Sequence, residues 1–352
     1  MTEGVSRKFK VLSFVFTVVI VLYHANNVFT THYVLQGEAN ARLNIFFECA
    51  ASMAMSYFFM TSGFLLYRDA GRENAAKKIK RRCISLLLPL FVWSCIYFAK
   101  EILTAHNGGD MDLRITTILY NFTFRPYDGP LWYNFAIFLL CLLIVPVTAV
   151  RGKQHVIPVC AICVCAVSLL VYGFGLLGWF GISEEFDLAA WTVRLCRYIP
   201  SYVLGCLLGI YKNQLIEFRL TPGYRWMTAA GAAAVLFAAC ALPDLRWLRL
   251  MIVTIAPVLI WLSVPNPGTG NALKWIRVSF LMYAAHMMVI SVVFMLADRF
   301  FQREMGTAGL MYWVLFLLAV ALCTYLMCCI IAYVLDRFNL KTLKIMLTGD
   351  RL

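Results

Sequence analysis

The first apolar segment of the chain ends in Val18-Val19-Ile20-Val21-Leu22-Tyr23-His24-Ala25-Asn26-Asn27. This stretch places an ionisable imidazole inside a segment that is long and apolar enough for a membrane helix. Other polar side chains share its face, because residues three, four or seven apart lie on one side of a helix that turns about 100° per residue. The polar residues of this face are Ser13, Thr17, His24 and Asn27. A titratable group in hydrocarbon is costly unless it faces a polar cavity or a partner, so the stripe predicts a functional site within a helix bundle.

The composition is that of an integral membrane protein. Of the 352 residues, 62% are hydrophobic and only 14% are charged, and the mean hydropathy is +0.77. A soluble chain carries about 25% charged residues. The formal net charge of +13 is spread over short runs between apolar segments. This placement favours loops at a membrane surface, with the lipid bilayer as partner, and argues against nucleic-acid binding.

Ten apolar runs are long enough to cross about 30 Å of hydrocarbon. No linker or soluble domain separates them, so residues 1–352 are predicted to form one all-α membrane domain. The runs are 11–30, 44–67, 84–103, 131–150, 156–178, 190–211, 226–242, 247–264, 278–298 and 309–335.

The basic residues orient these spans. With both termini in the cytoplasm, 21 of the 31 Lys and Arg residues fall inside, and 10 fall outside or near the outer ends of spans. Because basic residues favour the cytoplasmic side, this two-to-one excess predicts ten spans with both termini inside.

The 13 cysteines lie mostly within the apolar runs and form no cluster with His and carboxylate residues in the sequence. Small apolar residues in a helix bundle explain them, and neither a disulfide framework nor a metal site is expected.

A second intramembrane histidine ends the stretch Ser279-Phe280-Leu281-Met282-Tyr283-Ala284-Ala285-His286. Tyr283 and His286 lie three residues apart and therefore share a helix face. Counted from the cytoplasmic ends at about 1.5 Å per residue, His286 lies about 13 Å deep and His24 about 21 Å deep. The two histidines are predicted to approach each other in the middle-to-outer half of the bundle.

The basic run Lys77-Lys78-Ile79-Lys80-Arg81-Arg82 follows the second span. It can enforce topology, hold anionic lipid headgroups or bind the phosphates of a cofactor. Ser62-Gly63, near the end of the second span, can serve close helix packing or the approach of a ligand.

Aromatic and basic side chains mark the predicted outer side. Trp132 and Tyr133 open the fourth span, where aromatic residues form interfacial belts and can also stack on sugar rings. Arg194 and Arg197 lie near the outer end of the sixth span. Arginines at this depth either face a cavity or extend toward the interface.

Taken in order, these segments resemble acyltransferase family 3, the bacterial membrane O-acyltransferases, from end to end of the chain. The tail and the short loops are most similar to its single-domain branch. The matching pieces are Val21-Leu22-Tyr23-His24, Ser62-Gly63-Phe64-Leu65-Leu66, the basic run leading to Pro89 and Trp93, Pro130-Leu131-Trp132-Tyr133, Tyr283-Ala284-Ala285-His286 and Leu347-Thr348-Gly349-Asp350-Arg351.

The resemblance implies a multi-pass enzyme of the bacterial plasma membrane. Such an enzyme transfers an acyl group, usually acetyl, from cytoplasmic acyl-CoA to a hydroxyl of a saccharide or lipid-linked saccharide. It also implies roles for individual residues, with no metal ion among them. His24 is the expected general base, Asn27 or Tyr283 polarises or positions it, and His286 is a second polar participant. Lys78, Arg81, Arg82 and Ser62 are expected to bind the donor, and Trp132, Arg194 and Arg197 the acceptor.

Three positions depart from the family's pattern. Ser13 stands where an Arg usually precedes the histidine, Ser85 where a second basic residue is common, and Phe135 near the place of an Arg after the tryptophan. Arg68, Lys80 or Arg81 are candidates to replace the missing donor contacts.

Two other functions also fit the sequence. A transporter of saccharides or small amphiphiles also fits ten spans with buried His and Arg, but the chain has no paired halves and no matching broken spans. A homologue that binds its partner without catalysis is the third possibility.

Overall fold

The apolar runs fold as helices because a backbone in hydrocarbon must satisfy its own N–H and C=O groups. The computed structural model describes residues 2–35, 38–105, 114–127, 129–150, 156–182, 187–211, 220–266, 273–299, 304–305 and 308–351. The predicted inside charges at 151–153 and 212–219 lie outside these ranges. The elements in chain order are α1 (Glu3–His32), β1 (Val34–Leu35), α2 (Glu38–Tyr67), α3 (Ala75–Arg82), the π-helical η1 (Cys83–Leu87), α4 (Leu88–Ala105), α5 (Ile115–Thr123), α6 (Trp132–Leu142), α7 (Ile144–Ala149), α8 (Val156–Ser168), the π-helical η2 (Leu169–Gly173), α9 (Leu176–Trp179), α10 (Asp187–Cys196), α11 (Ile199–Ile210), α12 (Pro222–Ala241), α13 (Arg246–Ser263), α14 (Leu273–Ile276), α15 (Ser279–Ala297), β2 (Glu304–Met305), α16 (Ala308–Arg337) and α17 (Lys341–Thr348).

The all-α membrane fold predicted from the sequence is confirmed. Within the described ranges, nine helices are long and apolar enough to cross a membrane, and the bent pair of α10 and α11 makes a tenth if it is one span. Each of them lies on one of the ten predicted apolar runs. The two-residue strands β1 and β2 pair in parallel and join the end of α1 to the segment before α16.

The sixth span is broken rather than continuous. Its helical parts, Leu188–Cys196 and Ile199–Ile210, meet at an angle of 44°. Pro200 lies in the first turn of α11, where its missing N–H interrupts no helical hydrogen bond, so a new helix starts there more easily than the old one continues. The break leaves Arg194 and Arg197 close to the bend.

The third span starts earlier than the sequence pattern predicts. Its helix begins at Ala75, so the basic run forms helical turns continuous with the span instead of a loop. Ala, Lys and Arg are good helix formers, which explains the extension. Lys78 and Arg82 are thereby four residues apart on one helix face.

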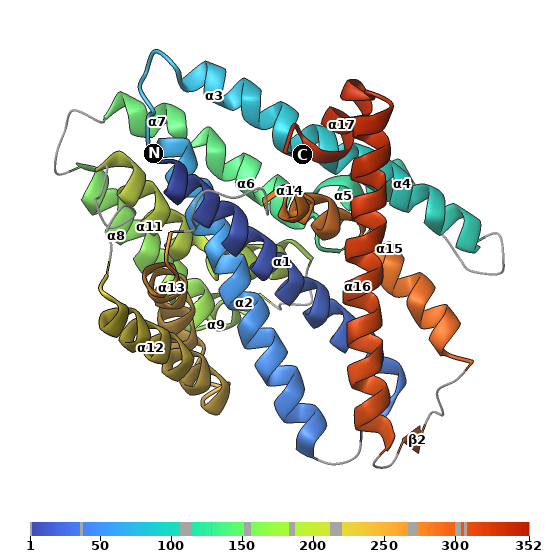
Figure 1. The fold of residues 1–352 in the computed structure, drawn as a ribbon. Coiled ribbons are helices and arrows are strands. Elements are labelled where there is room, and N and C mark those ends of the chain that lie inside the picture. The colour runs from blue at the N-terminus through green and yellow to red at the C-terminus, as the bar shows by residue number, and fades with distance from the viewer. Residues whose placement is uncertain are drawn as a thin grey trace.

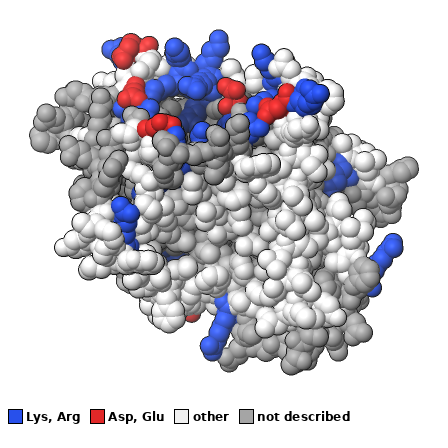
Figure 2. Space-filling model, in the orientation of Figure 1, with Lys and Arg blue, Asp and Glu red and all other residues white. Residues whose placement is uncertain are grey.

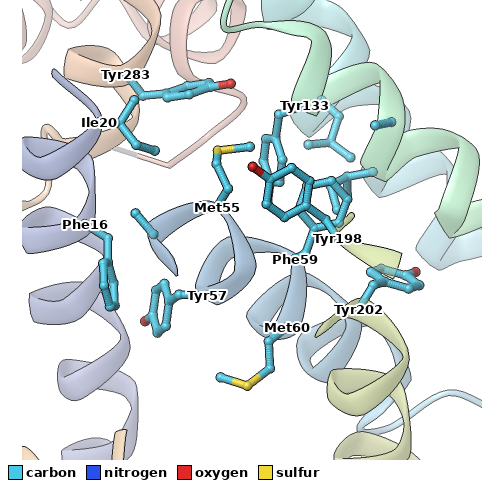
Figure 3. Packing of buried hydrophobic residues seen from close by; sticks show 14 of the residues in the cluster. Phe16, Ile20, Met55, Tyr57, Phe59, Met60, Tyr133, Tyr198, Tyr202 and Tyr283 are labelled. Carbon is cyan, nitrogen blue, oxygen red and sulfur yellow. The ribbon is translucent and has the colours of Figure 1, made fainter. Parts of the chain in front are cut away.

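Close packing between α2 and α11 forms the centre of the bundle. A Cβ on Gly63 would lie 2.5 Å from the carbonyl oxygen of Tyr202, and one on Gly205 would overlap the carbonyl oxygen of Met60. Small residues at such contacts let two backbones approach closely. Next to this seam Phe59 stacks on Tyr198, with ring centroids 5.1 Å apart, and Tyr133 lies beside them (Figure 3).

Both termini lie at the same end of the bundle, where α3 and α17 are also found (Figure 1). On the face shown in Figure 2, most Lys and Arg side chains gather at this end together with Asp and Glu, and a few further Lys and Arg side chains lie on the rest of that face. By the positive-inside rule this end is cytoplasmic. The opposite end is called the outer end below.

Candidate active site

Two histidines from helices far apart in the sequence meet inside the bundle. His24 of α1 and His286 of α15 have ring centroids 5.1 Å apart. His24 lies eight residues before the end of α1 at His32, about 12 Å from the outer end of that helix. The structure thus confirms the predicted approach of the two rings in the middle-to-outer half.

The surroundings of His286 determine which of its nitrogens carries the proton. Its side chain is fully buried, and Nδ1 lies 2.7 Å from the carbonyl oxygen of Tyr283. A carbonyl only accepts hydrogen bonds, so Nδ1 donates and Nε2 carries the lone pair of the neutral ring. Nε2 is buried and has no hydrogen-bond partner among the described residues, so it remains available as an acceptor.

His24 lies on a cavity of about 330 Å³ in the outer half of the bundle. This volume is at the lower end of the range of small-molecule sites. His24 is half-buried at its wall, whereas His286 lies behind that wall. Further wall residues are Tyr23, Glu48, Ser52, Pro130, Trp132, Arg194, Arg197, Tyr198 and Tyr283.

A charged network borders this cavity. Oε1 of Glu48 in α2 lies 3.3 Å from Nη1 of Arg197 and 2.9 Å from Nη2 of Arg249. Arg197 also bonds the hydroxyl of Ser52. Glu48 was not predicted as a site residue, although it is a lone carboxylate within the second apolar run. Like His24, it is an ionisable group inside a span, and this signal predicts a functional residue.

Trp132 and Arg194 form the part of the wall expected to bind the acceptor. The guanidinium carbon of Arg194 lies 5.4 Å from the ring centroid of Trp132, in a cation–π contact. Trp132 is largely buried and Arg194 is exposed toward the cavity. The structure therefore brings all three predicted acceptor residues, Trp132, Arg194 and Arg197, to one cavity.

The structure shows which contacts Asn27 and Tyr283 make, and their role toward His24 stays a prediction. The hydroxyl of Tyr283 donates to the carbonyl of Pro130, which fixes the start of α6 against α15. Asn27 lies nearly one turn beyond His24 and its backbone carbonyl accepts from the hydroxyl of Thr31 at 2.7 Å. No hydrogen bond joins either side chain to His24 among the described residues.

On the cytoplasmic side, the residues of the basic run differ in their burial and in the groups that they contact. Lys78 donates to the carbonyl of Leu66 at 2.7 Å and so covers the end of α2. Arg81 is exposed on the outside of α3, whereas Arg82 is half-buried and close enough to Tyr133 to interact electrostatically. The hydroxyl of Tyr133 lies 2.8 Å from Oγ of Ser62. Of the predicted donor residues, the structure thus brings Arg82 and Ser62 to a common place beside Tyr133.

The segment after α17 adds a guanidinium to this place. Trp93 Nε1 donates to the carbonyl of Leu347 at 3.0 Å, and Gly349, with φ of +61°, turns the chain against the backbone of Ser85. A side chain at this glycine would be strained, and its Cβ would lie 2.5 Å from the Ser85 carbonyl oxygen.

After this turn the guanidinium carbon of Arg351 lies 4.2 Å from the ring centroid of Phe280. Burial and the neighbouring charge of Arg82 lower the pKa of Arg351 to about 10. At Ser85, where the sequence lacks an expected basic residue, the structure therefore holds the turn that brings in Arg351. The tail Leu347-Thr348-Gly349-Asp350-Arg351 is part of the family resemblance, but no role was predicted for Arg351.

Within the described ranges, nine membrane-length helices and the bent pair of α10 and α11 surround a histidine pair, with a polar cavity on one side and arginines on the other. This arrangement defines a multi-pass membrane protein with an intramembrane site. The model of acyltransferase family 3, described as an acyltransferase domain, matches residues 9–332 of this chain. The chain belongs to this family and is a membrane acyltransferase. No curated protein and no solved structure matches it.

Proposed function

We propose that the protein transfers an acyl group, usually acetyl, from cytoplasmic acyl-CoA to a hydroxyl of a saccharide or lipid-linked saccharide, with His24 as general base. The observation that carries this proposal is the position of His24. Its ring forms part of the wall of the outer cavity and also contacts the buried ring of His286. An intramembrane imidazole that borders a cavity on one side and lies beside an unpartnered ring acceptor on the other suits proton transfer.

In the reaction the acceptor hydroxyl oxygen attacks the thioester carbonyl carbon while His24 takes the hydroxyl proton. The C–S bond then breaks, the ester of the saccharide forms, and the sulfur leaves as the thiol of CoA after taking the proton from His24. General-base assistance of this kind contributes about 10²- to 10⁴-fold to the rate.

His286 is proposed to position the base. Because its Nε2 is an unpartnered acceptor, a ring N–H of His24 can donate to it. That bond would leave the other ring nitrogen of His24 unprotonated, which is the state a general base requires.

The donor's phosphates are proposed to bind Arg82 and Arg351. Both guanidinium groups lie at the cytoplasmic end, and each repels the other. Phosphate oxygens match the fork of an arginine and would neutralise this pair. Arg81 is exposed on α3, so we propose that it sets the membrane topology or contacts lipid headgroups instead of the donor.

The test is release of free thiol from acetyl-CoA by the full chain in nanodiscs, with a panel of saccharide acceptors. We expect acceptor-dependent release that falls at least about 100-fold in His24→Gln. His32→Gln is the matched control, because His32 is an exposed histidine on the same helix and should keep wild-type release. Undiminished release in His24→Gln, with an unchanged unfolding temperature, would refute the proposed base.

A further inference from the structure

The outer cavity carries more positive than negative charge. Glu48 contributes a single carboxylate, and it is already shared between Arg197 and Arg249. Within the described part of the cavity wall, Glu48 is the only acidic residue. Arginines within membrane-spanning segments usually face a cavity or a partner and mark binding sites, so an excess of arginine at this cavity calls for an anion.

Arg194 is the cavity arginine that does not take part in the ion pairs with Glu48. It lies in α10, three residues before Arg197, and it makes no ion pair with any described residue. Its guanidinium carbon lies 5.4 Å from the ring centroid of Trp132, and this cation–π contact keeps the group at the cavity wall while its N–H donors stay available. A planar fork of donors next to an aromatic face is suited to an oxyanion on a ring-shaped ligand.

The position of His24 adds a geometric condition. His24, Trp132 and Arg194 all border one cavity of about 330 Å³, which is of the size for a small ligand or one end of a larger one. A ligand anchored at Arg194 by its anionic group therefore reaches His24 with another part of the same unit.

From this arrangement we infer that the acceptor is an anionic saccharide, whose carboxylate or phosphate binds Arg194 beside Trp132 and whose hydroxyl faces His24. The inference rests on the proposed function and specifies its acceptor class. Carboxylate and phosphate share the oxyanion chemistry that the site recognises, and the experiment separates the two sources.

The first measurement is acetyl transfer by the full chain in nanodiscs of zwitterionic lipid, with three acceptors: methyl glucoside, methyl glucuronide and methyl glucoside 6-phosphate. We expect kcat/KM for at least one anionic acceptor to exceed that of the neutral glucoside at least about 10-fold, which corresponds to about 1.4 kcal/mol. In Arg194→Gln this ratio should fall to about one. Arg246→Gln, at the outer end of α13 and away from the cavity wall, should keep the ratio.

A binding measurement tests the anion site without depending on which sugar the enzyme uses as acceptor. Sodium glucuronate and inorganic phosphate should each raise the unfolding temperature of the wild type at constant ionic strength, and methyl glucoside should not. Both shifts should disappear in Arg194→Gln.

Equal shifts in wild type and Arg194→Gln, or equal kcat/KM for neutral and anionic acceptors, would overturn the inference while the proposed transfer stands. Absence of any thiol release or CoA binding would instead overturn the proposed function.

Discussion

At the outer end of the bundle the carboxylate of Glu48 lies between two guanidinium groups, whereas at the cytoplasmic end Arg82 and Arg351 repel each other. No described carboxylate lies in an ion pair with Arg82 or Arg351. The outer network is thus largely satisfied within the protein, and apart from Arg194 it serves to hold α2, the bend between α10 and α11, and α13 around a cavity. The inner pair is incomplete on its own, which is the condition expected of a site for a highly charged, water-soluble ligand.

The outer cavity depends on the seam between α2 and α11, and the largest effect is expected there. Gly205→Ala places a Cβ on the carbonyl oxygen of Met60, and backbone cannot move aside as a flexible side chain can. We expect a loss of about 3 kcal/mol in stability, the upper part of the usual range for overpacking. The measurement is the unfolding temperature together with the yield of monodisperse protein.

Gly231→Ala in α12 is the control for this substitution. The nearest atom to its Cβ would be Leu259 Cδ1 at 3.7 Å, and alanine is favoured over glycine within a helix by about 1 kcal/mol. This variant should be as stable as the wild type or more so. If Gly205→Ala behaved in the same way, the seam would not be what fixes the cavity.

The histidine pair lies between the outer network around Glu48 and the cytoplasmic pair of Arg82 and Arg351. His286→Phe keeps a ring in the same space but removes the Nε2 acceptor, so His24 would lose the partner proposed to orient it. We expect kcat to fall about 10- to 100-fold while KM for the donor stays within twofold. A merely structural role would instead lower the unfolding temperature and leave kcat per folded molecule unchanged.

Arg82 and Arg81 are adjacent in sequence, but only Arg82 turns toward the bundle, which makes them a matched pair at the cytoplasmic end. Arg82→Gln should raise KM for acetyl-CoA about 10-fold or more, because a hydrogen bond to a charged group is worth about 1.5–3 kcal/mol. Arg81→Gln should change it less than twofold. The measurement is steady-state kinetics at fixed acceptor concentration. Equal effects of the two substitutions would show that the basic run attracts the donor by its total charge and not through Arg82 in particular.

The membrane spans and the histidine pair could be predicted from the sequence, but the contacts between charged residues could not. Hydropathy and helical period are local properties, so the ten runs and the stripes ending in His24 and His286 could be predicted. The bend before Pro200 and the extension of the third span to Ala75 depend on competition between neighbouring turns and were missed. Glu48 with Arg249, and Arg351 with Arg82, join residues about 200 or more positions apart, and no local pattern records such a contact.

Arg351 allows the smallest but most diagnostic test of the inner pair. Arg351→Gln removes one of two mutually repelling guanidinium groups, so the protein without donor should become slightly more stable and its unfolding temperature should rise. The same change should raise KM for acetyl-CoA about two- to fivefold, because one charged donor to the phosphates is lost. Stability gained together with affinity lost distinguishes a ligand-binding arginine from a structural one.

The pKa of Arg351 predicts how the stability difference between Arg351→Gln and the wild type changes with pH. The pKa of Arg351 in the folded protein, about 10, lies below its ordinary value, so the folded state disfavours the charged form. The penalty is fully present below about pH 10 and is relieved as the pH rises through that value. The difference in unfolding temperature between Arg351→Gln and wild type should therefore be constant from pH 7 to 9 and shrink above about pH 10. Saturating acetyl-CoA at pH 7 should stabilise the wild type more than the variant, since the phosphates neutralise the pair only where both arginines are present.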